Sequence, residues 1–387
     1  MNRPDIPPNA LPDVVSHLHP NPRRPQLPAL TGLRFFLAAH VLLFHFAPSF
    51  FGDSGFGRNL IRSGSSAVSV FFLLSGFILT YTHLETGDSP ALPTLNVGIA
   101  RFWTTRFLRI YPAYVVAFII AAPFAIYQFR ATGGHYGSFC AKTAAYLLML
   151  QGWVPNLWHY WNYPAWSLSA EAFFYALFPA LVAIVLTRKS GDWLMLTAAW
   201  LAGLIVPILL LDRIEYEWLL ASPPLHLPEF IFGMLAAKQF IAGAIRPPSI
   251  LTAVRRWIGP LAAIVIVLAD GCGWFPPALL DHAALAPLVG ILFFRLARNE
   301  SRILAFLRWR PIVYLGEVSY GIYILQFPVF TGCFVIAKRL GIPWDTRATF
   351  VAVSAVLIIA ASLSFELIET PARRWGTRWF RERLLSA

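Results

Sequence analysis

Repeated apolar stretches are the feature that most constrains how this chain can fold. Many of them approach the roughly 20 residues that a helix needs to cross a bilayer. Of the 387 residues 57% are hydrophobic and only 13% are charged, about half of the ~25% charged residues of a soluble domain. The sequence therefore predicts an all-α polytopic membrane protein, because a helix satisfies its own backbone inside lipid. Ten transmembrane helices are expected near residues 31–50, 67–84, 109–129, 168–187, 193–211, 223–241, 258–270, 283–298, 317–336 and 349–368.

Basic residues orient these spans. An eleventh apolar segment, 140–151, has only about 12 residues, which is short for a crossing. If it is a short or re-entrant helix, 22 of the 31 Lys and Arg residues lie on the cytoplasmic side, eight lie outside and Arg34 stands at a span edge. If it crosses, the later basic clusters move outside, against the positive-inside rule. We therefore expect a multi-pass protein with both termini cytoplasmic.

Three segments divide the chain. Residues 1–29 contain eight prolines and predict a disordered cytoplasmic tail. Residues 30–376 form the expected membrane domain, and 377–387 a basic cytoplasmic tail. The net charge of +12 fits loops that face anionic lipid, and no nucleic-acid-binding motif is present. The three scattered cysteines show no metal-binding spacing.

The first span carries ionisable residues that are expensive to bury in a membrane. Arg34 and His45 are 11 residues apart, close to three helical turns, so they share one face about 16 Å apart along the axis. His40 lies on another face, where a structural hydrogen bond to a neighbouring helix explains it. We expect Arg34 at the cytoplasmic end and a functional His45 deep in the membrane.

Two further spans carry polar clusters. Arg106 and Arg109 are neighbours on one helix face, a pattern that suits phosphate capture, although a positive-inside anchor explains it equally. Glu171 follows Ser167 at the expected outer end of its span and needs a partner there. A histidine from another helix is a natural partner, because a carboxylate orients an imidazole that acts as general base.

Other motifs are less specific. Glu369 and Arg373 are spaced to neutralise each other. The aromatic stretch "GWVPNLWHYWNYPAWS" suits a surface that stacks on sugars, or equally an interfacial belt. No nucleophile elbow, Gly-rich phosphate loop or HExxH motif occurs, and we predict no metal site.

The order of these motifs resembles the acyltransferase-3 family of integral-membrane acyltransferases, over about residues 29–376. The motifs are "LTGLRFFLAAHVLLFH", "VFFLLSGFILT", the pair Arg106 and Arg109 followed by "IYP", "WSLSAEAFFY", "LPEFIFGM", "SYGIYILQFPV" and "ETPARRW".

The resemblance implies an enzyme of the bacterial inner membrane that moves a short acyl group, usually acetyl, from cytoplasmic acyl-CoA to a sugar hydroxyl. The acceptor is an exopolysaccharide, a lipopolysaccharide or a peptidoglycan precursor, and polysaccharide-assembly proteins are possible partners. Acyl-CoA is a co-substrate, and no permanently bound cofactor is expected. His45 and Glu171 are the expected catalytic residues, and Arg34, Arg106 and Arg109 the acyl-CoA-binding residues. The acceptor site or pocket is expected to be lined by Ser75, Trp166, Ser167, Tyr175, Ser319, Tyr323 and Gln326.

Two positions depart from the family pattern. Gln326 replaces a histidine and cannot carry a proton near neutral pH. His226, with Glu229 three residues later, stands where the family has arginine, and pairs with an acid only weakly. Two mechanisms are open: direct attack assisted by His45, or a relay through an acyl-His45 intermediate. Two other functions are also open: a flippase for a lipid-linked sugar, or an inactive scaffold.

Overall fold

The computed structural model describes residues 24–48, 55–84, 95, 98–185, 192–243, 252–272, 276–299, 302–344 and 346–385. These residues form helices and no strand. The helices are α1 (Pro28–Phe46), α3 (Gly55–Arg62), η2 (Ser63–Ser65), α4 (Ser66–His83), α5 (Ile99–Thr132), α6 (Tyr136–Leu147), η3 (Tyr163–Ala165), α7 (Trp166–Val185), α8 (Asp192–Leu210), α9 (Tyr216–Ala221), η4 (Pro223–His226), α10 (Leu227–Ile241), α11 (Thr252–Cys272), α12 (Pro277–Leu280), η6 (Ala283–Leu285), α13 (Ala286–Ala297), η7 (Ile303–Arg308), α14 (Arg310–Leu340), α15 (Arg347–Ser364), η8 (Phe365–Glu369) and α16 (Thr370–Leu385).

The prediction of an all-α membrane protein is confirmed. Each of the ten expected spans falls on a helix, and the segment expected near 140–151 is the 12-residue helix α6. Within the described part of the chain, seven helical segments are long and apolar enough to cross a membrane. The other three expected spans fall on α10, α11 and α13, so the count of ten crossings stays a prediction.

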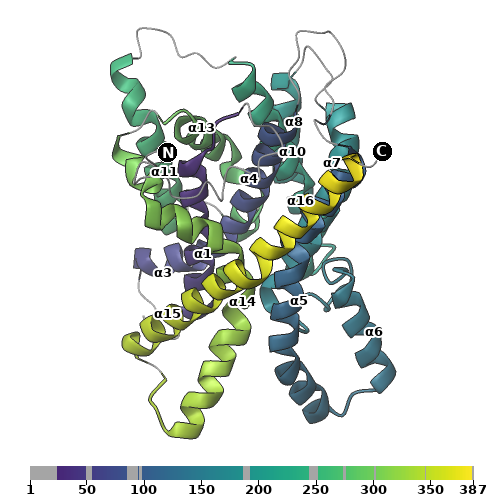
Figure 1. Cartoon of the computed structure of the whole chain (residues 1–387). Coiled ribbons are helices and arrows are strands. Elements are labelled where there is room, and N and C mark those ends of the chain that lie inside the picture. Colours follow the sequence, from purple (N-terminus) through teal and green to yellow (C-terminus); the bar gives the residue numbers. More distant parts are fainter. Residues whose placement is uncertain are drawn as a thin grey trace, which may run out of the picture.

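Two helices are longer than a bilayer requires. α5 has 34 residues and α14 has 31, about 51 and 46 Å at 1.5 Å per residue. Both extend beyond the rest of the bundle at the lower end of the view in Figure 1. Each ends at a glycine in the left-handed conformation, Gly133 and Gly341, which stops a helix without the steric cost of a Cβ atom.

Helices α4 and α10 cross with their backbones in direct contact. A Cβ atom on Gly76 would lie 2.1 Å from the carbonyl oxygen of Phe230, and one on Gly233 would lie 2.0 Å from that of Leu73. In lipid, association gains little from hydrophobic burial, so close packing of small residues joins helices instead. This crossing fixes α4, one wall of the cavity described below, against α10.

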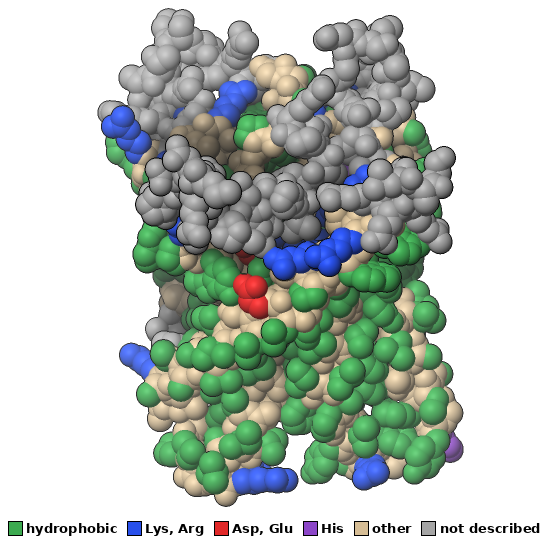
Figure 2. Space-filling model, in the orientation of Figure 1, with side chains coloured by type: hydrophobic (Ala, Val, Ile, Leu, Met, Phe, Trp, Pro, Cys, Tyr) green, Lys and Arg blue, Asp and Glu red, His purple; other side chains and the backbone are tan. Residues whose placement is uncertain are grey.

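The surface matches a membrane environment. Figure 2 shows hydrophobic side chains over the middle of one face, with Lys and Arg at its lower edge and above the hydrophobic zone. Large apolar side chains such as Leu194 and Leu209 on α8 are 74% and 70% exposed. A soluble surface rarely carries such contiguous apolar area, whereas lipid solvates it.

The predicted N-terminal tail falls mostly outside the described residues. Its last part contacts the bundle, because the Arg24 guanidinium donates hydrogen bonds to the backbone carbonyls of Tyr81 and Leu84. The first span begins at Pro28, whose fixed φ suits the first turn of a helix. Arg24 therefore packs on the end of α4, and Pro28 and Ala29 belong to α1.

Candidate functional site

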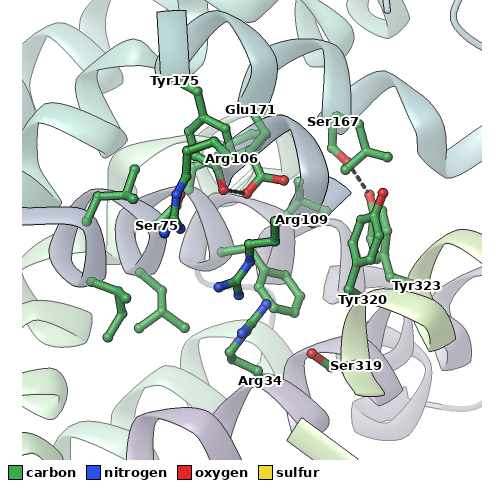
Figure 3. Close-up of a pocket in the computed structure, with 17 residues that line it drawn as sticks. Arg34, Ser75, Arg106, Arg109, Ser167, Glu171, Tyr175, Ser319, Tyr320 and Tyr323 are labelled. Atoms are coloured by element: carbon green, nitrogen blue, oxygen red, sulfur yellow. Dashed lines mark hydrogen bonds between the residues drawn. The ribbon is translucent and has the colours of Figure 1, made fainter. Parts of the chain in front are cut away.

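A cavity of about 100 Å³ lies among five helices that are distant in sequence. Figure 3 shows its polar side chains converging from α1, α4, α5, α7 and α14. Most of the pocket residues predicted from the sequence meet here, and the wall between them is apolar. The polar lining residues are Arg34, Ser75, Arg106, Arg109, Ser167, Glu171, Tyr175, Ser319, Tyr320 and Tyr323.

Three guanidinium groups dominate the charge of this cavity. Arg34 comes from α1, and Arg106 and Arg109 from consecutive turns of α5; the first and last point into the same central space in Figure 3. Among the described residues, no carboxylate lies within ion-pair distance of any of the three. The buried Nε of Arg106 has no hydrogen-bond partner among them. Guanidinium groups held in a cavity without an ion-pair partner are costly to desolvate, so this arrangement suits an anionic ligand.

A second, larger cavity adjoins the first. Its volume is about 460 Å³, and Arg34, Arg106 and Arg109 line both cavities. The stretch Pro25–Pro28 and the π-helical segment Phe365–Glu369 contribute to its rim. The three arginines therefore lie where the two cavities meet. We call the larger cavity the vestibule and the smaller one the inner chamber.

Glu171 does not form the predicted pair with His45. Its Oε1 accepts a hydrogen bond from the Tyr175 hydroxyl one turn further along α7, and the carboxylate faces the arginine cavity. We predicted that Glu171 would pair with His45 because the sequence places both residues in the outer halves of their spans. Helix packing instead directs the Glu171 face of α7 toward α5.

The remaining predicted lining residues fall in different places. Ser167 and Tyr323 share a 2.8 Å hydrogen bond across α7 and α14 at one edge of the cavity. Ser319 lines the cavity but donates to the carbonyl of Gly316. Trp166 is buried behind the wall, where its ring packs against Phe72, so the prediction that it lines the pocket is wrong.

His45 lies outside both cavities, at the far end of α1. Its Nδ1 is 3.0 Å from Oε1 of Gln326, whose Nε2 donates to the carbonyl of Tyr323 at 2.7 Å. Because the Gln326 amide nitrogen is used on the backbone, its oxygen faces His45 and accepts from Nδ1–H. The other ring nitrogen, Nε2, then carries the lone pair that a general base needs. Gln326, in place of the family's histidine, sets this tautomer.

Aromatic rings enclose the His45 imidazole. Tyr163 and Phe327 meet it edge to face, with ring centroids 5.1 and 5.2 Å away. The stretch that contains Tyr163 was expected to form an aromatic surface, yet Trp158 and Trp161 are only 3% and 9% exposed. Trp161 donates to the carbonyl of Phe118 on α5, so much of this stretch packs into the core.

Two residues that line the cavities were not assigned to the pocket from the sequence. Tyr320 lines both cavities and donates to the carbonyl of Ile110; its neighbour Tyr323 was the only tyrosine chosen from that motif. Arg373 lines the vestibule and forms a 2.8 Å ion pair with Glu369. That i, i+4 pair was predicted, but its position at the vestibule depends on how the π-helical segment turns the last helix toward α5.

The geometry therefore consists of an arginine-lined pair of cavities and, at the other end of α1, the His45–Gln326 pair, and comparisons with known proteins identify the class of protein. Residues 27–366 match the acyltransferase domain family, Acyl_transf_3. This chain belongs to that family, and it is a multi-pass membrane acyltransferase.

Individual relatives extend the comparison. Acyltransferase MdmB of Streptomyces mycarofaciens is 31% identical over 91% of this chain and 93% of its own length. Peptidoglycan O-acetyltransferase OatA of Listeria monocytogenes is 24% identical over 91% of this chain, which spans only 57% of that longer relative. No solved structure matches this chain.

Proposed function

We propose that this protein transfers a short acyl group, most readily acetyl, from acyl-CoA to a hydroxyl of a carbohydrate acceptor. The observation that carries the proposal is the convergence of Arg34, Arg106 and Arg109 at the junction of the two cavities, with no ion-pair partner among the residues that the structure describes. Coenzyme A is a polyanion, and guanidinium forks bind phosphate oxygens with parallel hydrogen bonds. The vestibule has room for a large head group, and the inner chamber for a thin chain.

The acyl group then reaches His45. Arg34 and His45 are separated by about 16 Å along α1. The Ser167–Tyr323 hydrogen bond lies at the edge of the inner chamber, and the backbone carbonyl of Tyr323 accepts from Gln326. We propose that the acyl-carrying arm of the donor spans this distance. A donor entering from the vestibule and an acceptor approaching His45 from the opposite end would make acylation the step that crosses the membrane.

The chemistry proposed for His45 is general base catalysis. Nε2 removes the proton of the acceptor hydroxyl as its oxygen attacks the thioester carbonyl carbon. The new C–O bond forms, the C–S bond breaks, and the imidazolium returns the proton to the departing thiolate. Gln326 positions the ring, and Glu171 contributes to the charge of the donor chamber rather than to proton transfer at His45.

The acceptor class is drawn from the relatives. OatA is named for peptidoglycan O-acetylation, which supports a sugar hydroxyl as the acceptor in a bacterial cytoplasmic membrane. Exopolysaccharide, lipopolysaccharide and peptidoglycan precursors share that chemistry. The flippase alternative rests only on buried charges, and the family membership favours the enzyme.

Binding of coenzyme A tests the donor site directly. We expect the purified chain to bind coenzyme A, and the Arg106→Ala/Arg109→Ala variant to bind it at least about tenfold more weakly, because each charge-assisted hydrogen bond is worth about 1.5–3 kcal/mol. Isothermal titration at low and high salt measures the affinity, which should fall with salt. Arg101→Ala, on the same helix but outside both cavities, is the control and should bind like wild type. Equal binding by the double variant would remove the arginines from the donor site.

A further inference from the structure

A second polar cluster lies behind the wall of the inner chamber. His226 ends η4, Glu229 lies in the first turn of α10, and His282 immediately precedes η6. Their side chains are 0%, 0% and 1% exposed. One potential ligand atom from each residue lies within 4.8 Å of the others. The ring of His226 packs on Phe72, which lines the chamber, with centroids 4.9 Å apart.

The hydrogen bonds of His226 leave a contradiction that a bound cation resolves. Its Nε2 lies 2.7 Å from the carbonyl oxygen of Leu220, so this nitrogen carries the proton and donates. In the neutral ring Nδ1 then has a lone pair, yet it faces Oε1 of Glu229 at 3.3 Å. Two acceptors at that distance repel unless a proton or a metal ion stands between them.

The unpaired atoms of His282 and Glu229 favour a metal ion over a proton as the bound cation. Within the described part of the chain, neither ring nitrogen of His282 nor Oε2 of Glu229 has a hydrogen-bond partner, although all three atoms are buried. A proton on His226 would satisfy Glu229 Oε1 and leave these atoms unpaired, at a cost of about 1–3 kcal/mol each. A metal ion would take one lone pair from each of His226, Glu229 and His282, which leaves one ring nitrogen of His282 rather than two to be paired.

The distances from Glu229 to the two histidines are close to those of a zinc site. Nδ1 of His226 and Nδ1 of His282 lie 3.3 and 3.6 Å from Oε1 of Glu229. Ligands about 2.0–2.1 Å from a tetrahedral zinc ion are about 3.3–3.4 Å apart. The donation from His226 Nε2–H to a backbone carbonyl is also the contact by which proteins commonly orient a metal-binding histidine. Two neutral imidazoles and one carboxylate are a ligand set that zinc favours.

We propose that His226, Glu229 and His282 bind a zinc ion as three of its four ligands. The ion ties the start of α10 to the segment before η6 and supports Phe72 from behind the chamber wall. No metal site was predicted from the sequence, because His226 and Glu229 are close in sequence but His282 is brought to them only by the fold. This inference stands independently of the acyl donor and acceptor.

Metal analysis of the full-length chain tests the proposal without an activity assay. The protein is purified in detergent with a tag that contains no histidine, stripped with a chelator, and reloaded with one equivalent of zinc. We expect the wild-type chain to regain about one zinc per chain with a melting temperature about 5 °C or more above that of the stripped protein. Glu229→Gln and His282→Ala should retain at least about tenfold less zinc.

The control is His40→Gln, at a half-buried histidine whose Nε2 contacts the carbonyl of Leu60; it should bind zinc like wild type. The comparison of stripped with reloaded wild-type protein tests the proposal even if a variant fails to fold. No zinc and no shift in melting temperature for the wild type would overturn the proposal and leave a protonated His226–Glu229 pair. Zinc retained by both site variants would also overturn it, because the ion would then bind elsewhere.

Discussion

At the scale of single residues, the two ends of α1 have different surroundings. Arg34 lies with two arginines of α5 where the two cavities meet, whereas His45 is hydrogen-bonded to Gln326 and packed among aromatic rings. The same helix face carries both, yet the Glu171 carboxylate joins the arginine end. This separates the charge that suits a phosphate-bearing donor from the neutral imidazole that suits a base.

His45→Ala is expected to lower the turnover number by about 10²–10⁴-fold, the usual contribution of a general base, with the affinity for coenzyme A kept. Loss of acetyl transfer is measured with radiolabelled acetyl-CoA and an added saccharide acceptor. His40→Gln, at a histidine on another face of the same helix, should keep turnover within about twofold, since it can still donate to Leu60. Wild-type turnover in His45→Ala would remove this residue from catalysis.

At the scale of elements, glycine-mediated crossings set where the walls of the chamber lie. Gly76 and Gly233 bring α4 and α10 into backbone contact, and Gly316 does the same for α14 against the start of α1, where a Cβ atom would lie 1.9 Å from the Thr31 carbonyl oxygen. A side chain at any of these positions must push a helix backbone aside. The distances between cavity residues depend on these contacts.

Gly233→Ala should therefore destabilise the protein although alanine favours helices, because an overpacked contact costs about 1–3 kcal/mol or more. We expect a melting temperature in detergent about 3 °C or more below wild type, measured by intrinsic fluorescence. Gly137→Ala is the matched control: it also places alanine in a helix, but no atom lies within 4 Å of the new Cβ. An unchanged melting temperature for Gly233→Ala would mean that the two helices are further apart than described.

At the scale of the whole molecule, α1 begins and α16 ends on the same side of the bundle, and α5 carries the chain to the opposite side (Figure 1). The vestibule, rimmed by Pro25–Pro28 and Arg373, opens toward the side on which α1 begins. The distribution of basic residues predicts that this side faces the cytoplasm. Access to a cytoplasmic donor depends on that orientation.

Fusion reporters measure the orientation. A fluorescent protein fused after Ala387 should fluoresce, and alkaline phosphatase at the same point should be inactive, because both report a cytoplasmic C-terminus. Alkaline phosphatase fused after Gly133, at the end of α5, should be active and serves as the control for export. An active phosphatase at the C-terminus would reverse the predicted topology and place the vestibule outside.

The sequence by itself determined the class of the protein and the positions of its helices, and it predicted the arginines that line both cavities. Hydropathy and charge are local, so each apolar stretch falls on a helix, and the ordered motifs identify the acyltransferase family. Only the tertiary structure decided which side chains meet. It separated Glu171 from His45, joined His45 to Gln326, buried Trp158 and Trp161, and brought His282 to Glu229. Those contacts depend on which helix faces turn toward each other, and packing between segments far apart in the chain sets that rotation.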